Sequence, residues 1–299
     1  MRRAGKHQRA LLPWRGSAFL AALLLALSVL SGCAGERSSE TRGGEWHYLQ
    51  FDTEQRAVYD AFRKACDDPF SEEPVGIVDE SGESVRVSVR DADTVYQGFL
   101  YDHPELFWLD QTYRYRLSGE EDETAYTDAV AVISVAASYK DQKQMQKEFE
   151  AAKRQMLSGI PDRGHDGERA FTIYQRLTEG ADYKEETLYD PSMKSGHTAY
   201  GAVVNRGAVC DGFALACKYL LNAKGIECIL IPGTSGGQAH VWVTAMWDGK
   251  WHEADPTRDV CAEEGEKGQF FDLTTEEMNK DHAREESILT KAVPIAEDR

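Results

Sequence analysis

The clearest helical pattern in the chain lies between residues 209 and 225. Apolar residues recur there at the spacing of one helix face, and Gly225 follows them at the position of a helix end. The shared face consists of Phe213, Ala216, Cys217, Leu220 and Leu221. The pattern predicts a helix that begins close to Cys210, just after the turn Asn205-Arg206-Gly207.

A β-hairpin is predicted to follow this helix. Residues 239–247 form the first strand of the prediction, Asp248-Gly249 a type I′ turn and residues 250–255 the returning strand. Because so short a turn fixes the register, Trp242 is expected to lie opposite Asp255.

The same register decides which polar side chains meet. His240 is expected opposite Thr257, so that His240 and Asp255 become diagonal neighbours on one face, with Cβ atoms roughly 7 Å apart. His252 is expected on the other face of the hairpin. Glu253 is expected to lie too far along the strand from His240 to pair with it. The register therefore selects Asp255 as the partner of His240.

The N-terminal half has the pattern of an α+β region. Helices are predicted at 53–66, from Asp91 to before Pro104, at 141–157 and at 166–179, and strands at 85–89, 106–109, 113–117 and 124–135. The aromatic residues of the strands could form a sugar-binding surface, but a packed core is the more frequent use of such residues. Residues 158–161 are the best candidate for a linker.

The N-terminus has the pattern of a secretory leader. Basic residues precede an apolar run from Ala18 to Leu30, which is shorter than the roughly 20 residues of a membrane-spanning helix. The ending Leu30-Ser-Gly-Cys33 resembles a bacterial lipobox, which implies cleavage before Cys33 and lipidation of its thiol. Ordinary secretion is the alternative. We expect a lipid-anchored protein that faces away from the cytoplasm.

The charge of the chain argues against nucleic acid as a partner. The net charge is −17, and removal of the five basic residues within 1–32 would bring it to about −22. The acidic residues are spread through loops, and no stretch has the spacing of a calcium-binding loop. We therefore expect no metal and no cofactor.

Six cysteines remain to be assigned. Cys33 is expected to carry lipid and Cys210 to carry chemistry, which leaves Cys66, Cys217, Cys228 and Cys261. Disulfides are permitted in an exported chain, but the sequence does not choose among the three complete pairings. Cys217 and Cys228 lie in apolar runs and could equally be buried free thiols.

The central region combines the residue types of nucleophilic catalysis. Cys210 in the first turn of a helix lies in the field of the helix dipole, which favours the thiolate, and N–H groups there could stabilise an oxyanion. Gly212 has no side chain to block a substrate. His240 can take the thiol proton, and Asp255 can orient the imidazole. Each residue alone would more often be structural, but the three together predict a catalytic site.

These residues carry a resemblance to the transglutaminase-like superfamily. Ala208-Val-Cys-Asp-Gly-Phe-Ala214 is similar to its nucleophile motif, Ala239-His-Val-Trp242 to its histidine strand and Asp255-Pro-Thr257 to its aspartate motif. The resemblance implies a papain-like α+β fold, with the nucleophile at the start of a helix packed on an antiparallel sheet. A small α+β region precedes this core.

The resemblance also implies residue roles. Cys210 would be the nucleophile, His240 its general base and acid, and Asp255 the group that orients the imidazolium. Tyr200 is similar in placement to residues that complete the oxyanion hole in relatives, although a core tyrosine is the alternative. Arg258 stands where many bacterial relatives carry an aromatic residue, which would change the rim of the cleft.

The expected organisation has four parts. They are a signal peptide at 1–32, a flexible tether at 33–45, an N-terminal α+β region at 46–160 and a transglutaminase-like catalytic domain at 161–299. The expected function is cysteine-dependent acyl transfer on amide or peptide bonds, as a peptidase, deamidase or cross-linking enzyme. Cell-wall peptides or other peptides and proteins are the expected substrates. The alternative is a catalytically silent, surface-anchored interaction module.

Overall fold

The computed structural model describes residues 44–71, 73–117, 129–138, 141–263 and 265–297. These residues belong to one compact unit, Glu40–Arg299. The predicted signal peptide, the lipidation site Cys33 and most of the tether lie outside the described residues. Among the described residues, no helix is long and apolar enough to cross a membrane.

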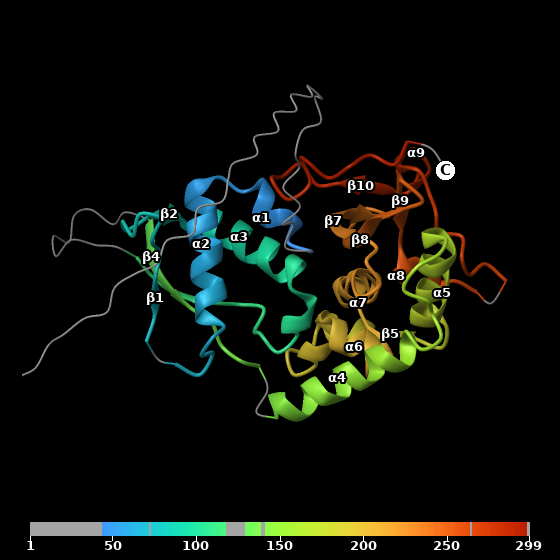
Figure 1. Cartoon of the computed structure of the whole chain (residues 1–299), viewed down its shortest axis with the longest axis horizontal. Coiled ribbons are helices and arrows are strands. Elements are labelled where there is room, and N and C mark those ends of the chain that lie inside the picture. The colour runs from blue at the N-terminus through green and yellow to red at the C-terminus, as the bar shows by residue number, and fades with distance from the viewer. Residues whose placement is uncertain (1–43, 72, 118–128, 139–140, 264, 298–299) are drawn as a thin grey trace, which may run out of the picture. The chain divides into compact units, whose positions relative to one another are not determined.

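The described chain alternates helices with short strands (Figure 1). The α-helices are α1 (Trp46–Gln50), α2 (Thr53–Ala65), α3 (Val89–Asp102), α4 (Gln142–Met156), α5 (Asp166–Thr178), α6 (Ala199–Val203), α7 (Cys210–Asn222), α8 (Pro256–Cys261) and α9 (Thr275–Met278). The strands are β1 (Val75–Gly76), β2 (Val87–Ser88), β3 (Arg114–Leu117), β4 (Ala129–Ser134), β5 (Asp182–Tyr183), β6 (Gly207–Ala208), β7 (Cys228–Ser235), β8 (Gln238–Trp247), β9 (Lys250–Ala254) and β10 (His282–Arg284).

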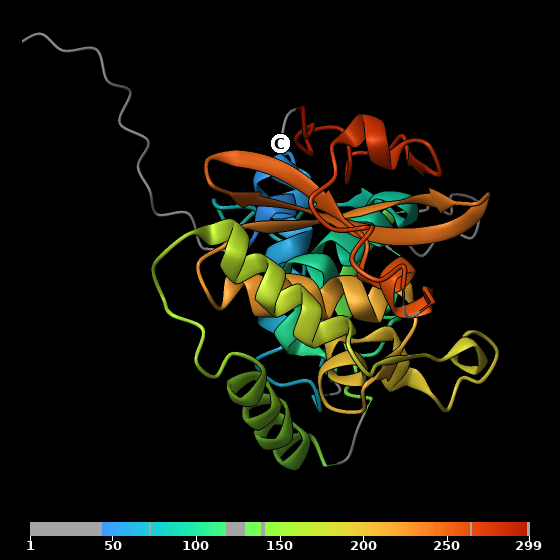
Figure 2. The same ribbon diagram turned by 90° about the vertical axis from the view of Figure 1, so that its right-hand side faces the viewer.

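Helix α7 is the centre of the fold. Its residues Gly212–Leu221 are all buried, because the helix contacts α5, α6, α8 and the strands β7 and β8. Figure 2 shows the same helix from the side, below the sheet that contains β7 and β8. The predicted helix is confirmed at both ends, since it begins at Cys210 and Gly225 follows it at φ 74°.

The sheet beside α7 has the antiparallel order β10-β7-β8-β9. The predicted hairpin is confirmed between β8 and β9: Trp247 pairs with Lys250, and Asp248 and Gly249 have positive φ, as a type I′ turn requires. In this ladder His252 lies opposite Ala245 and Glu253 lies opposite Thr244, so the predicted register holds for both residues.

The predicted pairings beyond Ala254 are wrong. Strand β9 ends at Ala254, and Asp255 is the N-cap of α8, with Thr257 inside that helix. Pro256 explains the change, because it has no N–H for a ladder and is favourable in the first turn of a helix. Asp255 therefore reaches the face of His240 from a helix end and not from a strand.

The N-terminal region forms a second sheet, in which β4 pairs with β1, β2 and β3. Helices α2 and α3 confirm the predictions for 53–66 and for the segment before Pro104, and Asp52 with Gln55 forms the capping box of α2. The strand predicted at 106–109 is wrong, since Pro104–Leu106 is a 3₁₀ helix followed by a turn. Pro104 again favours a helical start over an extended one.

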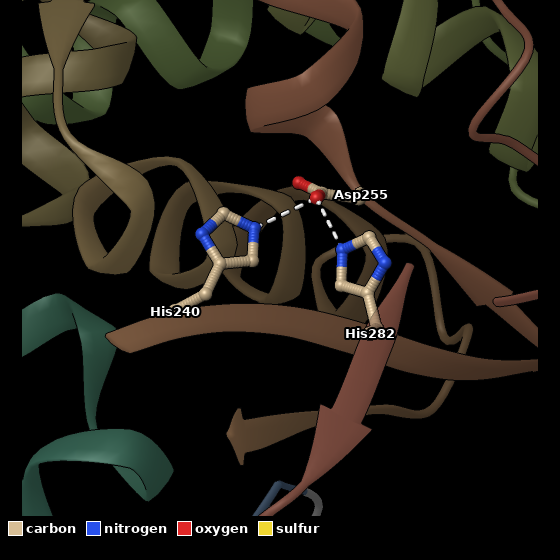
Figure 3. A group of neighbouring side chains, drawn as sticks. All are labelled: His240, Asp255 and His282. Carbon is tan, nitrogen blue, oxygen red and sulfur yellow. Dashed lines mark hydrogen bonds and ion pairs between the residues drawn. The ribbon is translucent and has the colours of Figure 1, made fainter. Parts of the chain in front are cut away.

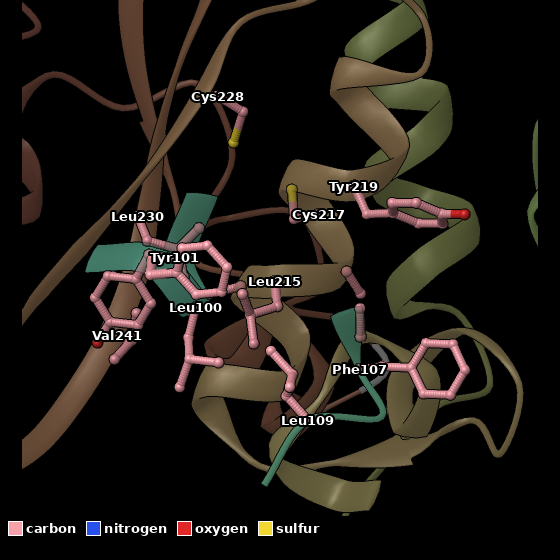
Figure 4. Close-up of a cluster of buried hydrophobic side chains, with 14 of the residues drawn as sticks. Leu100, Tyr101, Phe107, Leu109, Leu215, Cys217, Tyr219, Cys228, Leu230 and Val241 are labelled. Carbon is pink, nitrogen blue, oxygen red and sulfur yellow. The ribbon is translucent and has the colours of Figure 1, made fainter. Parts of the chain in front are cut away.

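The N-terminal region packs directly on α7. Figure 4 shows Leu100 and Tyr101 of α3 beside Leu215 of α7 and Val241 of β8, and all four side chains belong to one buried cluster. The domain boundary near residue 160 stays a prediction.

The cysteines of the described residues are free thiols. Cys66, Cys210, Cys217, Cys228 and Cys261 form no disulfide with one another. Cys217 of α7 and Cys228 of β7 are buried neighbours (Figure 4), and the hydrogen bond between them holds the pKa of Cys217 well above its ordinary value. Cys217 and Cys228 are therefore buried free thiols in the structure and do not form a disulfide.

Candidate active site

Cys210 is the first residue of α7 and is partly exposed. The preceding residues Gly207 and Ala208 form β6, which pairs with β5 and fixes the approach of the chain to the helix. The N-cap Val209 provides no side-chain acceptor for the N–H groups of the first turn. The thiol therefore lies at the positive end of a long buried helix, as the sequence predicts.

Gly212 serves packing and not substrate access. A Cβ atom at this position would lie 2.4 Å from the carbonyl oxygen of Gly196 and 2.8 Å from the Cβ of Ala208. The expectation that Gly212 clears a path to Cys210 is therefore corrected. Its absent side chain allows α7 to approach the segment 196–198, which positions the start of the helix.

His240 lies between the thiol and the carboxylate. Its Nε2 is 2.7 Å from Oδ2 of Asp255 (Figure 3), and its ring also hydrogen-bonds with Cys210. The side chain of His240 is 10% exposed, whereas that of Asp255 is fully buried. The structure thus brings together the three residues that the sequence selected.

The carboxylate of Asp255 is held by four donors. The backbone N–H groups of Thr257 and Arg258 donate to Oδ1 at 2.9 and 3.2 Å, and the two histidines His240 and His282 lie 2.7 and 3.0 Å from Oδ2. Both oxygens are therefore fixed, one by the helix start and one by imidazole rings. This arrangement makes Asp255 the helix cap and the partner of His240 at once.

The charges of the pair reinforce each other. Burial opposes the charged form of His240, but hydrogen bonds to Asp255 and Cys210 outweigh it and raise the pKa of His240 from 6.5 to about 9. Burial would likewise raise the pKa of Asp255, but hydrogen bonds from His240 and His282 outweigh it and lower this pKa from 3.8 to about 2. At neutral pH the site holds an imidazolium beside a carboxylate.

These pKa shifts predict that stability depends on pH. The contribution of His240 is complete below pH 6.5 and is lost as the pH rises through about 9, whereas that of Asp255 is complete above pH 3.8 and is lost as the pH falls through about 2. We expect the urea midpoint of the wild type to fall between pH 6.5 and 9, and to fall less in His240→Gln. An equal fall in both proteins would contradict the pairing.

His282 is the residue of this site that sequence reasoning missed. It lies on β10, which pairs with β7, and its side chain is fully buried against Trp242 at a ring distance of 4.9 Å. No motif marks it, because β10 is three residues long and joins the sheet only through the tertiary fold. Because His282 lies far from Asp255 in sequence, local sequence patterns do not reveal this contact.

His240, Asp255 and His282 are also the described residues that could hold a metal ion. Each offers one ligand atom, and these atoms lie within 4.8 Å of one another. The distances of 2.7 and 3.0 Å from the two histidine nitrogens to Oδ2 of Asp255 are hydrogen-bond distances, so hydrogen bonds are enough to explain this arrangement.

Tyr200 lies in the core beside Phe107 and Phe149. Its hydroxyl donates to Glu148 at 2.6 Å. The role of Tyr200 in an oxyanion hole stays a prediction.

A second histidine–carboxylate pair flanks the nucleophile. Nδ1 of His197 lies 2.8 Å from Oδ2 of Asp211, the residue after Cys210, and this hydrogen bond raises the pKa of His197. Both residues line a cavity of ≈ 20 Å³, which is space for about one water molecule.

Arg258 is exposed, and its backbone N–H donates to Asp255. Its guanidinium forms an ion pair with Asp281 and lies 5.1 Å from the ring centre of Phe270. The ion pair links the start of α8 to the residue before His282.

Comparison with known proteins finds a family and several distant solved structures. Residues 150–256 match the transglutaminase-like superfamily. The chain is 13% identical to a TGase (TM-score 0.34, covering 48% of this chain and 44% of that one). It is 13% identical to a proposed protease from Parabacteroides distasonis (TM-score 0.29, covering 46% of this chain and 30% of that one). It is 11% identical to a proposed cysteine protease from Cytophaga hutchinsonii (TM-score 0.31, covering 50% of this chain and 63% of that one). The match spans less than two thirds of each of these proteins, and no curated protein matches the sequence.

Proposed function

Because residues 150–256 match the transglutaminase-like superfamily, we propose that the chain is an enzyme that uses Cys210, His240 and Asp255 for acyl transfer from amide or peptide bonds. The observation that carries the proposal is the position of His240, whose Nε2 lies 2.7 Å from the buried carboxylate of Asp255 and whose pKa is raised by Asp255 and by the neighbouring Cys210. A base between a nucleophile and an orienting carboxylate is the arrangement that this chemistry requires.

The reaction proceeds in two halves. The thiolate of Cys210 attacks the carbonyl carbon, and His240 gives its proton to the leaving amine as the C–N bond breaks. The resulting thioester is attacked by water or by an acceptor amine, which loses a proton to His240. The C–S bond then breaks, which restores the thiolate of Cys210 beside the imidazolium of His240. Water gives hydrolysis or deamidation, and an amine gives cross-linking.

The exposure of the residues supports turnover over a silent module. Cys210 and His240 are partly exposed, whereas Asp255 is buried. A substrate can reach groups that are open to solvent, and a buried carboxylate keeps its full effect on the imidazole.

Location and substrate belong to the same proposal. The leader pattern of residues 1–32 and Cys33 supports a lipid anchor and a position outside the cytoplasm. The substrates available there are peptides and proteins of the cell envelope, including cell-wall peptides. Nucleic acid is a poor partner for so acidic a chain.

Alkylation of Cys210 tests the activated thiol without knowledge of the substrate. Iodoacetamide reacts with the thiolate, so loss of the imidazole in His240→Ala should slow alkylation near pH 6.5 by about tenfold or more. The modified peptide is quantified by mass spectrometry, which separates Cys210 from the other cysteines. Equal rates in both proteins would sink the proposal and favour the interaction module.

The acceptor is identified in a second assay. The full chain and Cys210→Ala are incubated with peptidoglycan peptides or with protein substrates, with and without an amine donor. A thioester or product that forms only with the wild type supports acyl transfer, and its mass distinguishes hydrolysis from transfer to the amine.

A further inference from the structure

His282 and His240 both hydrogen-bond with the same oxygen of Asp255. Nε2 of His240 and Nε2 of His282 lie 2.7 and 3.0 Å from Oδ2, and the centres of the two rings are 5.4 Å apart. Figure 3 shows the carboxylate between the two imidazoles. His282 lies beyond residues 150–256, so this contact comes from a part of the chain outside the matched segment.

The contacts of His282 fix the direction of its hydrogen bond with Asp255. Asp255 is ionised in the working range of pH, because its pKa is lowered to about 2, so Nε2 of His282 donates to Oδ2. Nδ1 of His282 is buried and has no hydrogen-bond partner among the residues that the structure describes. The polar contact that anchors the side chain of His282 is therefore the one with Asp255.

We propose that His282 is a positioning residue of the active site, whose buried ring donates a hydrogen bond to the carboxylate of Asp255 and limits how firmly this carboxylate holds the proton of His240. The positive end of the Nε2–H dipole points at Oδ2 and reduces the negative potential that His240 experiences. Asp255 would keep its orientation without His282, since Thr257 and Arg258 hold its other oxygen. The contribution of His282 is thus electrostatic.

This role rests on the proposed function, in which His240 must both take and return a proton. A general base and acid works best when its pKa lies near the working pH. The pKa of His240 already lies at about 9, and an unshared carboxylate would raise it further. His282 therefore keeps the proton of His240 available for the leaving amine.

Other titratable groups surround the cluster and must be kept constant in a test. Cys210 hydrogen-bonds with His240, and Glu253 of β9 accepts from Trp242, which packs on His282. Arg258 and Asp281 pair beside the cluster. The charge of Asp255 in turn raises the pKa of four neighbouring groups, Tyr174 of α5, Cys217 of α7, and Asp259 and Cys261 of α8.

Histidine titration by NMR tests the proposal on the full chain. In the ¹⁵N-labelled wild type, Nε2 of His282 is expected to carry a proton wherever Asp255 is ionised. In His282→Phe, which keeps a ring but removes the donor, the pKa of His240 should rise by about one unit. In His282→Gln, whose amide can donate to Oδ2, this pKa should stay near the wild-type value.

His252→Gln is the matched control. His252 is also buried and pairs with a carboxylate, at 2.7 Å from Asp272, but it lies on the other face of the sheet. This variant should leave the titration of His240 unchanged, and a shift of His240 in His252→Gln would overturn the proposal by showing a general effect of histidine loss.

Two further results would overturn the proposal. One is a wild-type His282 whose Nε2 carries no proton while Asp255 is ionised, a measurement that needs no variant. The other is a pKa of His240 in His282→Phe that stays constant or falls. Neither readout involves a substrate, so a protein that failed to transfer acyl groups would contradict the proposed function and leave the sharing of Asp255 to be judged by these measurements.

Discussion

Replacing Asp255 by asparagine is expected to lower thiol-dependent turnover by about 10⁴-fold, the magnitude found when a triad carboxylate becomes an amide. The N–H groups of Thr257 and Arg258 require an acceptor at Oδ1, so the amide NH₂ must face His240 and His282. His240 would then accept at Nε2 and carry its proton on Nδ1. Because Nδ1 would already carry a proton, it could not accept the proton of the Cys210 thiol.

The measurement is the rate of Cys210 alkylation at neutral pH, followed by turnover once a substrate is known. Asp272→Asn is the matched control, because Asp272 lies 2.7 Å from Nδ1 of His252 on the other face of the sheet. We expect this control to react as the wild type does. Wild-type reactivity in Asp255→Asn would show that the amide can turn and that the helix cap does not fix its orientation.

Replacing Asp102 by asparagine is expected to lower the free energy of unfolding by about 3–5 kcal/mol. Lys218 lies 3.2 Å from Asp102, and both side chains are fully buried. Burial alone would raise the pKa of Asp102, but Lys218 and His47 hold it well below its usual range. An amide would leave the ammonium of Lys218 without its anion in the middle of the fold.

The amide also fails to match the other donors. Oδ1 of Asp102 faces Nδ1 of His47 at 2.8 Å, and Oδ2 accepts from the N–H of Tyr48 and the hydroxyl of Tyr59, both at 3.1 Å. In either orientation, the NH₂ of asparagine would meet donors. These contacts join α1, α2 and α3 to α7, so the loss should affect the whole described unit.

Urea unfolding measures this effect. Asp162→Asn is the control, since Asp162 also pairs with a lysine, Lys224 at 2.7 Å, but its side chain is 90% exposed. An exposed ion pair contributes between about 0 and 1 kcal/mol. A similar small loss in Asp102→Asn would show that Lys218 finds another partner.

Local patterns were enough to predict the elements that present the catalytic groups. The apolar spacing along α7 and the short turn at Asp248-Gly249 act over a few residues, so the start of the helix and the register of the hairpin follow from sequence. The pairing of His240 with Asp255 was also predicted, although the route was wrong. The helix cap that forms after Pro256 brings the carboxylate to the same place.

The sequence by itself determined which thiol, imidazole and carboxylate meet, because they lie on elements whose geometry is set by neighbouring residues. Only the tertiary structure decided that His282 shares Asp255 and that Lys218 is neutralised by Asp102, residues separated by 27 and 116 positions. Such contacts depend on how β10 joins the sheet and how α3 packs on α7. Neither leaves a periodic signal, because burial of the whole core, and not local spacing, brings these side chains together.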